Sequence, residues 1–405
     1  MEPLHVIIGA GQAGSWAAIG MRQAGFAGRI LIVGDEPWHP YERPPLSKAV
    51  LTEAEEPAVK FFQSVTTYDE RNIDLLLQTK VLEIDAKARR LTLDNGATQP
   101  FDKLLIATGG RARRLAIPGA EHAHYLRNLA DSRRLRSALV SASRVVCIGA
   151  GVIGLEVAAS ARALGASVLV LEAGAAPMGR CVSPEGAAAV DRIHRNAGVE
   201  IRYGVGVEGI VPVGARLRVA CANGPDEICD VVVAAIGMKR NVELAEQAGI
   251  ESDNGILVNA FGESSLADIY AAGDIAVFPH PIYQQPMRLE TWAHAQNHGL
   301  SVGRSMAGST QAYDEIPWFW SDQHRANIQV VGLATEAETT VVRADGGDDA
   351  FTAVHISKGG TVNGVTAINR AADIRAGRAL IRGRKPVNME ALRDASVPLA
   401  QAAAA

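Results

Sequence analysis

The chain has 405 residues, of which 48% are hydrophobic and 21% charged, and its formal net charge is −4. This length allows roughly two to four globular domains with sizeable cores. The slightly negative charge argues against a protein whose whole surface binds nucleic acid. The sequence contains no uncharged apolar stretch of about 18 residues, so no membrane-spanning helix is predicted.

The start of the chain and its cysteines indicate the compartment. An apolar run begins at Leu4 and leaves no room for a signal peptide. The four cysteines are scattered, and none forms a C-x-x-C pair or a zinc-ligand spacing: Cys147, Cys181, Cys221 and Cys229. We therefore expect a cytoplasmic protein with free thiols and no metal site.

The first predicted element is a strand over 4–8, which leads into a G-x-G-x-x-G motif and a helix over 16–22. In such a unit Gly9 permits the tight turn, Gly11 lets a pyrophosphate approach the backbone, and Gly14 lets the helix pack on the strand. The free N–H groups at the helix N-terminus bind phosphate oxygens. This pattern predicts a dinucleotide-binding unit.

The following segments extend that unit. A strand over 30–33 leads to Asp35, where a carboxylate accepts hydrogen bonds from an adenosine ribose. Three prolines within 40–48 favour either a fixed extended loop or a helix that starts near Leu46. Further strands are predicted over 73–77, 81–84, 91–93 and 103–108, the last of which runs into Gly109 and Gly110.

A second dinucleotide unit begins with a strand over 144–148. Its loop carries Gly149, Gly151 and Gly154, its helix runs from Leu155 to about Leu164, and its next strand ends at Glu172. Two complete units predict two bound dinucleotides. A carboxylate at Glu172 binds a free ribose 2′-hydroxyl and repels a 2′-phosphate, so we expect NADH rather than NADPH.

The rest of the chain first continues the mixture of predicted strands and helices and then, after Asp314, becomes rich in short strands. Strands over 230–235 and 268–272 enter the glycine-containing ends Ile236-Gly237 and Gly273-Asp274, and a helix is predicted over 290–306. After Asp314 the pattern is one of short strands followed by a helix, over 328–333, 339–343, 351–357, 364–368 and 373–382. The predicted fold is α/β, with two Rossmann-like domains and a C-terminal α+β domain.

These motifs together resemble a known family over nearly the whole length. They are G-A-G-Q-A-G at 9–14, R-P-P-L-S-K at 43–48, A-T-G at 107–109, G-A-G-V-I-G-L-E at 149–156, A-A-G-D at 271–274, E-T-W at 290–292 and P-W-F-W-S-D at 317–322. The chain resembles the FAD-dependent, NADH-oxidising ferredoxin reductases of Rieske-type aromatic-ring oxygenases and bacterial cytochromes P450. Apoptosis-inducing factor and rubredoxin reductases share the wider fold. One small departure is Ala150, where relatives often carry glycine.

The resemblance implies a discontinuous FAD domain with an inserted NADH domain. The expected boundaries are 1–110 and 237–312 for the FAD domain, 111–236 for the NADH domain and 313–405 for the C-terminal domain.

The motifs and the resemblance together assign the site residues. For FAD these are Gly9, Gly11, Gly14, Asp35, Arg43, Lys48, Ala107, Thr108, Gly109, Asp274, Glu290, Thr291 and Trp292. For NADH they are Gly149, Gly151, Val152, Ile153, Gly154, Glu156, Glu172, Arg180, Ile236 and Gly237. The expected catalytic residues are Lys48, Glu156 and Trp320.

The implied reaction is hydride transfer from NADH to the flavin N5, followed by the release of single electrons to an acidic [2Fe-2S] ferredoxin that feeds an oxygenase. A cation at Lys48 stabilises the anionic reduced flavin, Glu156 approaches Lys48 and the nicotinamide, and Trp320 lies at the exposed flavin side. Two basic clusters are candidates for salt-sensitive docking of the ferredoxin: Arg375, Arg378, Arg382, Arg384 and Lys385, or Arg111, Arg113 and Arg114.

Three other functions are alternatives to this interpretation. A flavin disulfide reductase needs a cysteine close to the flavin, but Leu46 follows Pro45 and no cysteine precedes Cys147. A rubredoxin reductase differs only in its acceptor, and the sequence does not exclude it. A redox-gated binding flavoprotein resembling apoptosis-inducing factor is expected to carry a targeting segment and a basic surface, and neither is indicated here.

Overall fold

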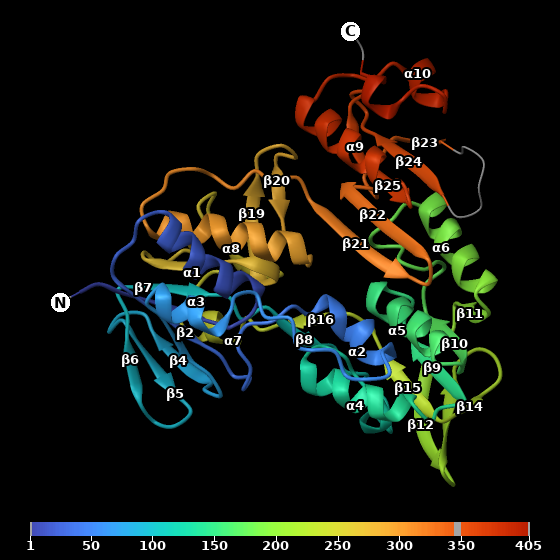
Figure 1. The fold of residues 1–405 in the computed structure, drawn as a ribbon, viewed down its shortest axis with the longest axis horizontal. Coiled ribbons are helices and arrows are strands. Elements are labelled where there is room, and N and C mark those ends of the chain that lie inside the picture. The colour runs from blue at the N-terminus through green and yellow to red at the C-terminus, as the bar shows by residue number, and fades with distance from the viewer. Residues whose placement is uncertain (1, 344–349, 404–405) are drawn as a thin grey trace. The chain divides into compact units, whose positions relative to one another are not determined.

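A computed structural model describes residues 2–343 and 350–403 (Figure 1). The chain forms two compact units. Unit 1 comprises residues 1–42, 58–111 and 239–315, and unit 2 comprises residues 43–57, 112–238 and 316–405. The predicted FAD domain differs from unit 1 chiefly in that it includes residues 43–57, which belong to unit 2, and the boundaries of the three predicted domains stay a prediction.

Unit 1 is built on a five-stranded parallel sheet. Its strand order is β18-β7-β1-β2-β3, with β1 at Leu4–Ile8, β2 at Arg29–Val33, β3 at Ile73–Leu76, β7 at Lys103–Ile106 and β18 at Ile269–Ala271. These strands are short apolar runs because helices and loops cover a parallel sheet on both faces. Residues that follow β1, β7 and β18 therefore share one edge of the sheet.

Two helices of unit 1, α1 (Gln12–Gln23) and α8 (Trp292–Met306), lie side by side (Figure 1). Glycines on α8 make this close approach possible. A Cβ at Gly299 would lie 2.3 Å from the Ala13 carbonyl oxygen, and one at Gly303 would lie 2.0 Å from the Ala17 carbonyl oxygen. The pair thus places the start of α8 in the same unit as the first glycine motif.

Smaller elements complete unit 1. They are an antiparallel sheet of β4 (Val81–Asp85), β5 (Arg90–Leu93) and β6 (Thr98–Pro100), a sheet of β17 (Ile256–Leu257), β19 (Ala276–His280) and β20 (Gln285–Met287), and the helices α3 (Val65–Glu70) and α7 (Glu243–Gln247). The short strands β8 (Gly110–Ala112) and β16 (Met238–Arg240) each contain a boundary between the units.

The first half of unit 2 holds a four-stranded parallel sheet of order β11-β10-β9-β15. Its strands are β9 (Arg144–Ile148), β10 (Ser167–Glu172), β11 (Val199–Tyr203) and β15 (Val231–Ala234), and its helices are α4 (Leu129–Leu139), α5 (Val152–Ala163) and α6 (Pro184–Asn196). An antiparallel sheet of β12 (Val207–Val213), β13 (Arg216–Cys221) and β14 (Glu227–Cys229) follows.

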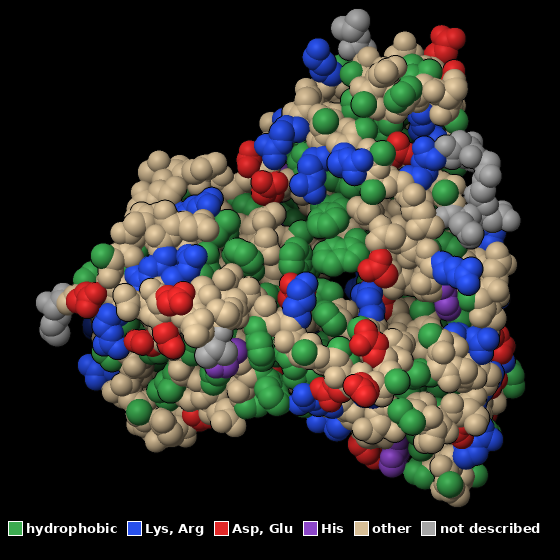
Figure 2. All heavy atoms as spheres, in the orientation of Figure 1, with side chains coloured by type: hydrophobic (Ala, Val, Ile, Leu, Met, Phe, Trp, Pro, Cys, Tyr) green, Lys and Arg blue, Asp and Glu red, His purple; other side chains and the backbone are tan. Residues whose placement is uncertain are grey.

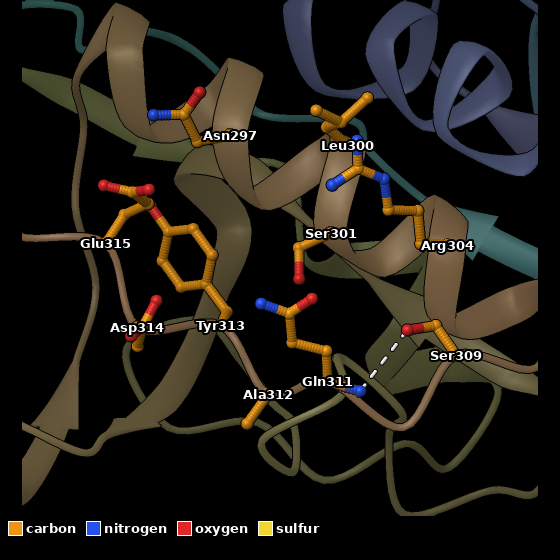
Figure 3. A pocket seen from close by; sticks show the side chains of 10 residues that line it. All are labelled: Asn297, Leu300, Ser301, Arg304, Ser309, Gln311, Ala312, Tyr313, Asp314 and Glu315. Carbon is orange, nitrogen blue, oxygen red and sulfur yellow. Dashed lines mark hydrogen bonds between the residues drawn. The ribbon is translucent and has the colours of Figure 1, made fainter. Parts of the chain in front are cut away.

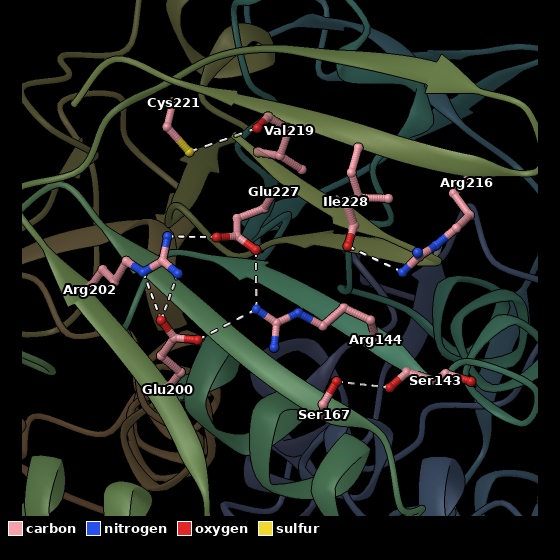
Figure 4. A network of polar contacts seen from close by, with 10 residues as sticks. All are labelled: Ser143, Arg144, Ser167, Glu200, Arg202, Arg216, Val219, Cys221, Glu227 and Ile228. Atoms are coloured by element: carbon pink, nitrogen blue, oxygen red, sulfur yellow. Dashed lines mark hydrogen bonds and ion pairs between the residues drawn. The ribbon is translucent and has the colours of Figure 1, made fainter. Parts of the chain in front are cut away.

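An ion-pair network links these two sheets (Figure 4). Glu227 of β14 binds Arg144 of β9 at 3.1 Å and Arg202 of β11 at 2.7 Å. Glu200 completes the network, 2.7 Å from Arg202 and 3.5 Å from Arg144. Arg144 stands at the start of β9, whereas the second glycine motif follows the end of that strand.

The second half of unit 2 holds a five-stranded antiparallel sheet of order β21-β22-β25-β24-β23. Its elements are β21 (Trp318–Gln323), β22 (Ala326–Gly332), β23 (Thr339–Arg343), β24 (Phe351–Ile356), β25 (Val362–Ile368), α9 (Ala371–Gly383) and α10 (Met389–Arg393). The buried guanidinium of Arg343 donates to the carbonyl oxygens of Leu392, Asp394 and Val397 and so holds the last segment of the chain.

The α/β fold class and both strand–loop–helix units are confirmed. The extended conformation considered for 40–48 is wrong, because a 3-10 turn over Pro44–Ser47 leads into the short helix α2 (Ala49–Thr52). Proline is compatible with the first turn of a helix, since the N–H it lacks has no partner there. Strand β21 and the sheet β12–β14 were not predicted. Among the described residues, no helix has both the length and the apolarity needed to cross a membrane.

Candidate active site

The first glycine loop packs tightly against backbone atoms at Gly9 and Gly14, whereas at Gly11 it leaves space for a ligand. Gly9 has a φ of +116°, and a Cβ there would lie 2.3 Å from the Ala107 carbonyl oxygen. A Cβ at Gly14 would lie 2.0 Å from the Gly9 carbonyl oxygen. A Cβ at Gly11, the N-cap of α1, meets nothing within 4 Å. This cradle fits a pyrophosphate held by the free N–H groups of α1.

The end of β2 carries two acids. Gly34 lies close to the loop, since a Cβ there would come 2.5 Å from the Ala10 Cβ. Asp35 is exposed next to it. The following residue, Glu36, accepts a hydrogen bond from the Tyr41 hydroxyl at 2.6 Å. An exposed carboxylate at Asp35 fits the predicted ribose contact, whereas Glu36 also anchors the loop that follows.

Asn241, a residue that the sequence did not single out, holds the A-T-G segment after β7. The Thr108 hydroxyl donates to the Asn241 carbonyl oxygen at 2.9 Å, and the Asn241 amide donates to the Thr108 carbonyl oxygen at 2.9 Å. The Asn241 backbone N–H donates to Gly109 at 3.0 Å. Ala107 and its two neighbours are thereby fixed at the same sheet edge as Gly9.

The Gly273-Asp274 loop after β18 is held by two polar side chains, the buried His298 and the partly buried Arg288. The Gly273 N–H donates to Nδ1 of His298 at 3.3 Å. Burial lowers the pKa of His298 to about 3, so its ring is neutral and able to accept. Arg288 donates to the Asp274 carbonyl oxygen at 3.1 Å. No motif in the sequence indicated either residue, because both act on backbone atoms.

The start of α8 presents the remaining residues assigned to FAD in unit 1. The Thr291 hydroxyl caps the helix by accepting from the His294 N–H at 3.1 Å, and Trp292 is the first helical residue. Glu290 is exposed and pairs with Arg288 at 2.5 Å. Arg43 and Lys48 belong to unit 2, where Arg43 donates to the Arg127 carbonyl oxygen at 2.7 Å, so their assignment to FAD stays a prediction.

The second glycine loop repeats the geometry of the first. Gly149 has a φ of +103°, and a Cβ there would lie 2.5 Å from the Ala235 carbonyl oxygen. A Cβ at Gly154 would lie 2.1 Å from the Gly149 carbonyl oxygen, and one at Gly151 meets nothing within 4 Å. Ala150 is buried and its N–H points to Glu172, so the missing glycine does not alter the loop.

Glu172 also organises the backbone around this loop. Its carboxylate accepts from the Ala150 N–H at 2.6 Å and from the Gly174 N–H at 2.7 Å. Arg180 is exposed and lies beside Gly237, where a Cβ would come 3.6 Å from its Nη2. The remaining residues assigned to NADH follow β15 or start α5: Ile236, Val152 and the half-exposed Ile153.

The structure brings Lys48 and Glu156 together in unit 2. Glu156 is only 3% exposed, and its Oε1 lies 2.7 Å from the Lys48 Nζ. The carboxylate also accepts from the Ser47 hydroxyl at 2.5 Å and from the Ser321 hydroxyl at 2.6 Å. A buried carboxylate is stable only when it is paired and hydrogen-bonded in this way. Ser47 and Ser321 lie inside the two most specific motifs, R-P-P-L-S-K and P-W-F-W-S-D, but nothing in the sequence indicated a role for either residue.

Trp320 forms part of an aromatic pair on β21. Its ring stacks on Trp318 with centroids 5.3 Å apart, and both side chains are half-buried. The Arg378 guanidinium of α9 lies 5.8 Å from the Trp318 ring. Lys and Arg side chains gather over α9 (Figure 2). By contrast, Arg111 of the other basic cluster pairs with Glu243 at 2.5 Å, and Arg114 stacks on Tyr125 at 4.6 Å.

A small pocket in unit 1 is separate from these groups. It lies between α8 and the segment 309–315 (Figure 3). Arg304, Gln311 and Tyr313 are among the residues that line it. It contains none of the residues assigned to FAD or NADH, so it is no candidate for the cofactor site.

Comparison with known proteins identifies the family. A family model described as pyridine nucleotide-disulphide oxidoreductase matches residues 4–299, and one described as reductase C-terminal matches residues 318–403. The chain belongs to the pyridine nucleotide-disulphide oxidoreductase family. Within it the chain is 41% identical, over 97% of either sequence, to the ferredoxin–NAD(+) reductase component of the p-cumate 2,3-dioxygenase system of Pseudomonas putida.

Solved structures of ferredoxin reductases share the fold of this chain. The ferredoxin reductase for the CYP199A2 system of Rhodopseudomonas palustris has a TM-score of 0.94 and 36% identity, covering 99% of this chain and 100% of that one. Putidaredoxin reductase, in its covalent complex with putidaredoxin, has a TM-score of 0.92 and 34% identity, covering 98% and 97%. The protein is therefore a ferredoxin–NAD(+) reductase that uses FAD and NADH.

The position of Glu172 in this reductase predicts its nucleotide preference. In Glu172→Ala the charge that repels a 2′-phosphate is lost, so the ratio of kcat/KM for NADH to that for NADPH should fall by about tenfold or more. Because Glu172 also holds the loop at Ala150, kcat/KM for NADH itself should fall. Steady-state reduction of ferricyanide with each nucleotide measures both effects. Comparable kcat/KM values for the two nucleotides in the unaltered enzyme would refute this role.

Proposed function

We propose that this reductase passes electrons from NADH, through FAD, to a [2Fe-2S] ferredoxin that supplies a Rieske-type dioxygenase or a cytochrome P450. We further propose that it does so in the cytoplasm, with Lys48, Glu156 and Trp320 as its catalytic residues. The observation that carries the proposal is the buried Glu156 carboxylate, which binds Lys48 and two hydroxyl groups. The named partners of the relatives, dioxygenase systems and putidaredoxin, support the choice of acceptor.

When bound, FAD accepts a hydride from NADH and passes the electrons on singly, which is chemistry that amino-acid side chains do not supply. The chain contributes a fixed electrostatic environment. Glu156 holds the Lys48 ammonium at 2.7 Å, and the Lys48 side chain remains 23% exposed. A positive charge held in place before the reaction stabilises negative charge that develops near it and needs no reorganisation.

The basic face of α9 is the proposed docking surface for the ferredoxin. Arg375, Arg382, Arg384 and Lys385 are exposed there, and Arg378 lies over Trp318. This places positive charge next to the Trp318–Trp320 pair, where an acidic electron carrier would be steered toward the aromatic rings. Arg111 and Arg114 are already engaged within the protein, so they are the weaker candidates.

Charge reversal on α9 tests this surface. The double variant Arg378→Glu/Arg382→Glu should raise the KM for an acidic [2Fe-2S] ferredoxin by about tenfold at low salt, and the effect should shrink near 0.5 M salt because screening weakens the attraction. Lys80→Glu/Lys87→Glu makes the same charge change on exposed residues of unit 1 and should leave KM unchanged. Ferricyanide reduction should be unaffected in both variants. An unchanged KM in the α9 variant would remove this surface from the proposal.

A further inference from the structure

A continuous row of hydrogen bonds runs from Glu156 to the surface of unit 2. The Ser321 hydroxyl lies 2.6 Å from Glu156 Oε1, and Gln323 Nε2 lies 2.9 Å from the Ser321 Oγ. Gln323 Oε1 lies 2.8 Å from His194 Nε2, and His194 Nδ1 lies 3.2 Å from His324 Nε2. Ser321, Gln323 and His194 are fully buried, whereas His324 is exposed.

Three different elements supply these groups. Glu156 lies on α5, Ser321 and Gln323 on β21, and His194 on α6, while His324 starts the two-residue turn between β21 and β22. His324 adopts a φ of +53°, which is costly for a residue with a side chain. The backbone of the turn is therefore strained at His324, and in this conformation the His324 ring is within hydrogen-bonding distance of His194.

Chemistry fixes the direction of every hydrogen bond in this row. An ionised carboxylate only accepts, so the Ser321 hydroxyl must donate its single proton to Glu156. Ser321 then can only accept from Gln323, which must present its NH₂ group. The Gln323 carbonyl oxygen is left to accept from Nε2–H of His194, so His194 Nδ1 accepts from His324.

The neutral state of His194 agrees with this arrangement. Burial lowers the pKa of His194 to about 4, and the neutral imidazole has one donor and one acceptor nitrogen, as the row requires. An amide does not pass protons along as a hydroxyl does, so Gln323 prevents the row from working as a proton wire. The row instead orients its side chains, because each of the four donors gives its hydrogen bond to the next group on the way to Glu156. The donors are His324, His194, Gln323 and Ser321.

We propose that Gln323 and His194 are positioning residues of the reductive reaction, which hold the Ser321 hydroxyl on Glu156 and thereby fix the Glu156–Lys48 ion pair. The inference rests on the proposed role of Lys48 and Glu156. Without Gln323 the Ser321 hydroxyl loses the donor that sets its orientation, so its hydrogen bond to the Glu156 carboxylate becomes less well defined. Lys48 is then held in less defined geometry, so hydride transfer slows while NADH binding is retained.

The test is anaerobic stopped-flow reduction of the FAD-loaded enzyme over a range of NADH concentrations. Gln323→Met and His194→Leu should lower the limiting rate constant by about tenfold, the effect of weakening one hydrogen bond to a charged group. The apparent Kd for NADH should stay within about twofold. His194→Gln keeps one donor and one acceptor, so it should restore most of the rate.

His355→Leu is the matched control. His355 is a fully buried histidine of unit 2 whose hydrogen-bond partners, Thr366 at 3.0 Å and Thr340 at 3.2 Å, do not belong to the row, so its loss should leave the rate unchanged. The inference is overturned if Gln323→Met and His194→Leu react at the wild-type rate, if His194→Gln is no better than His194→Leu, or if His355→Leu is equally slow. Lys48→Ala distinguishes failure of this inference from failure of the proposed function. If FAD reduction in Lys48→Ala is as fast as in the wild type, the proposed role of Lys48 is wrong and the inference that rests on it falls as well.

Discussion

Replacing Lys48 by alanine is expected to lower the limiting rate constant for anaerobic reduction of the bound FAD by NADH by about a hundredfold or more. The reason lies in the site: Glu156 is buried and holds the Lys48 ammonium at 2.7 Å, so the charge occupies one position before the reaction begins. Removing the ammonium also leaves a buried carboxylate with only Ser47 and Ser321 as partners.

Retention of FAD separates this effect from a loss of structure. The Lys48→Ala enzyme should purify with about the wild-type FAD content, because the glycine cradle at Gly9 and Gly11 lies in unit 1 and does not include Lys48. Lys60→Ala removes a lysine that is 68% exposed and paired with Glu42, and it should reduce FAD at the normal rate. Unchanged anaerobic reduction in Lys48→Ala would remove Lys48 from the catalytic residues.

Alanine at the third glycine of each loop is expected to remove a different nucleotide. A Cβ at Gly14 would lie 2.0 Å from the Gly9 carbonyl oxygen, and a Cβ at Gly154 would lie 2.1 Å from the Gly149 carbonyl oxygen. Both distances are far below van der Waals contact, so each loop must move. Gly14→Ala should therefore lose most of its FAD. Gly154→Ala should stay yellow and reducible by dithionite, with NADH reduction slowed by about a hundredfold or more.

Gly11→Ala provides the control that distinguishes lost binding from lost folding. A Cβ at Gly11 meets no protein atom within 4 Å, so the apoprotein should fold with unchanged thermal stability. The added methyl group would enter the space that we assign to the FAD pyrophosphate, so FAD affinity should nevertheless fall. Absorbance of bound FAD and thermal melting of the apoprotein measure the two effects. The assignment of the loops would be contradicted if Gly11→Ala kept its full FAD content. It would also be contradicted if Gly154→Ala lost its FAD but was not impaired in its reaction with NADH.

The sequence predicted those features that depend on backbone rules. Gly9, Gly14, Gly149 and Gly154 were recognisable because only glycine fits where a strand, a turn and a helix meet so closely. Apolar runs of strand length predicted the strands of both parallel sheets except β11. The prolines of 40–48 left open both an extended loop and a helix start near Leu46, and the structure has the helical alternative, because Pro44 and Pro45 begin a 3-10 turn.

Features that depend on tertiary contact could not be predicted. Asn241 and His298 act on backbone groups far away in the sequence, and nothing in their neighbours marks them. Ser321 and Gln323 are polar residues on one strand, and their direction toward Glu156 and His194 becomes visible only when α5, α6 and β21 come together. Aromatic residues favour strands, so Trp318, Phe319 and Trp320 were a usable signal for β21, but the three residues after them are polar and break the apolar/polar alternation of a half-buried strand.

The most direct test of the central claim is NADH-driven reduction of cytochrome c by the purified enzyme, with and without an added [2Fe-2S] ferredoxin. We expect slow reduction by the enzyme alone and strong stimulation by the ferredoxin, because we propose that the bound FAD delivers electrons to a one-electron carrier that docks beside Trp320. Cytochrome c reduction that is not stimulated by any [2Fe-2S] ferredoxin tested, but is stimulated by a rubredoxin, would contradict the proposed acceptor. Negligible turnover with a long-lived reduced flavin would contradict the electron-transfer role itself.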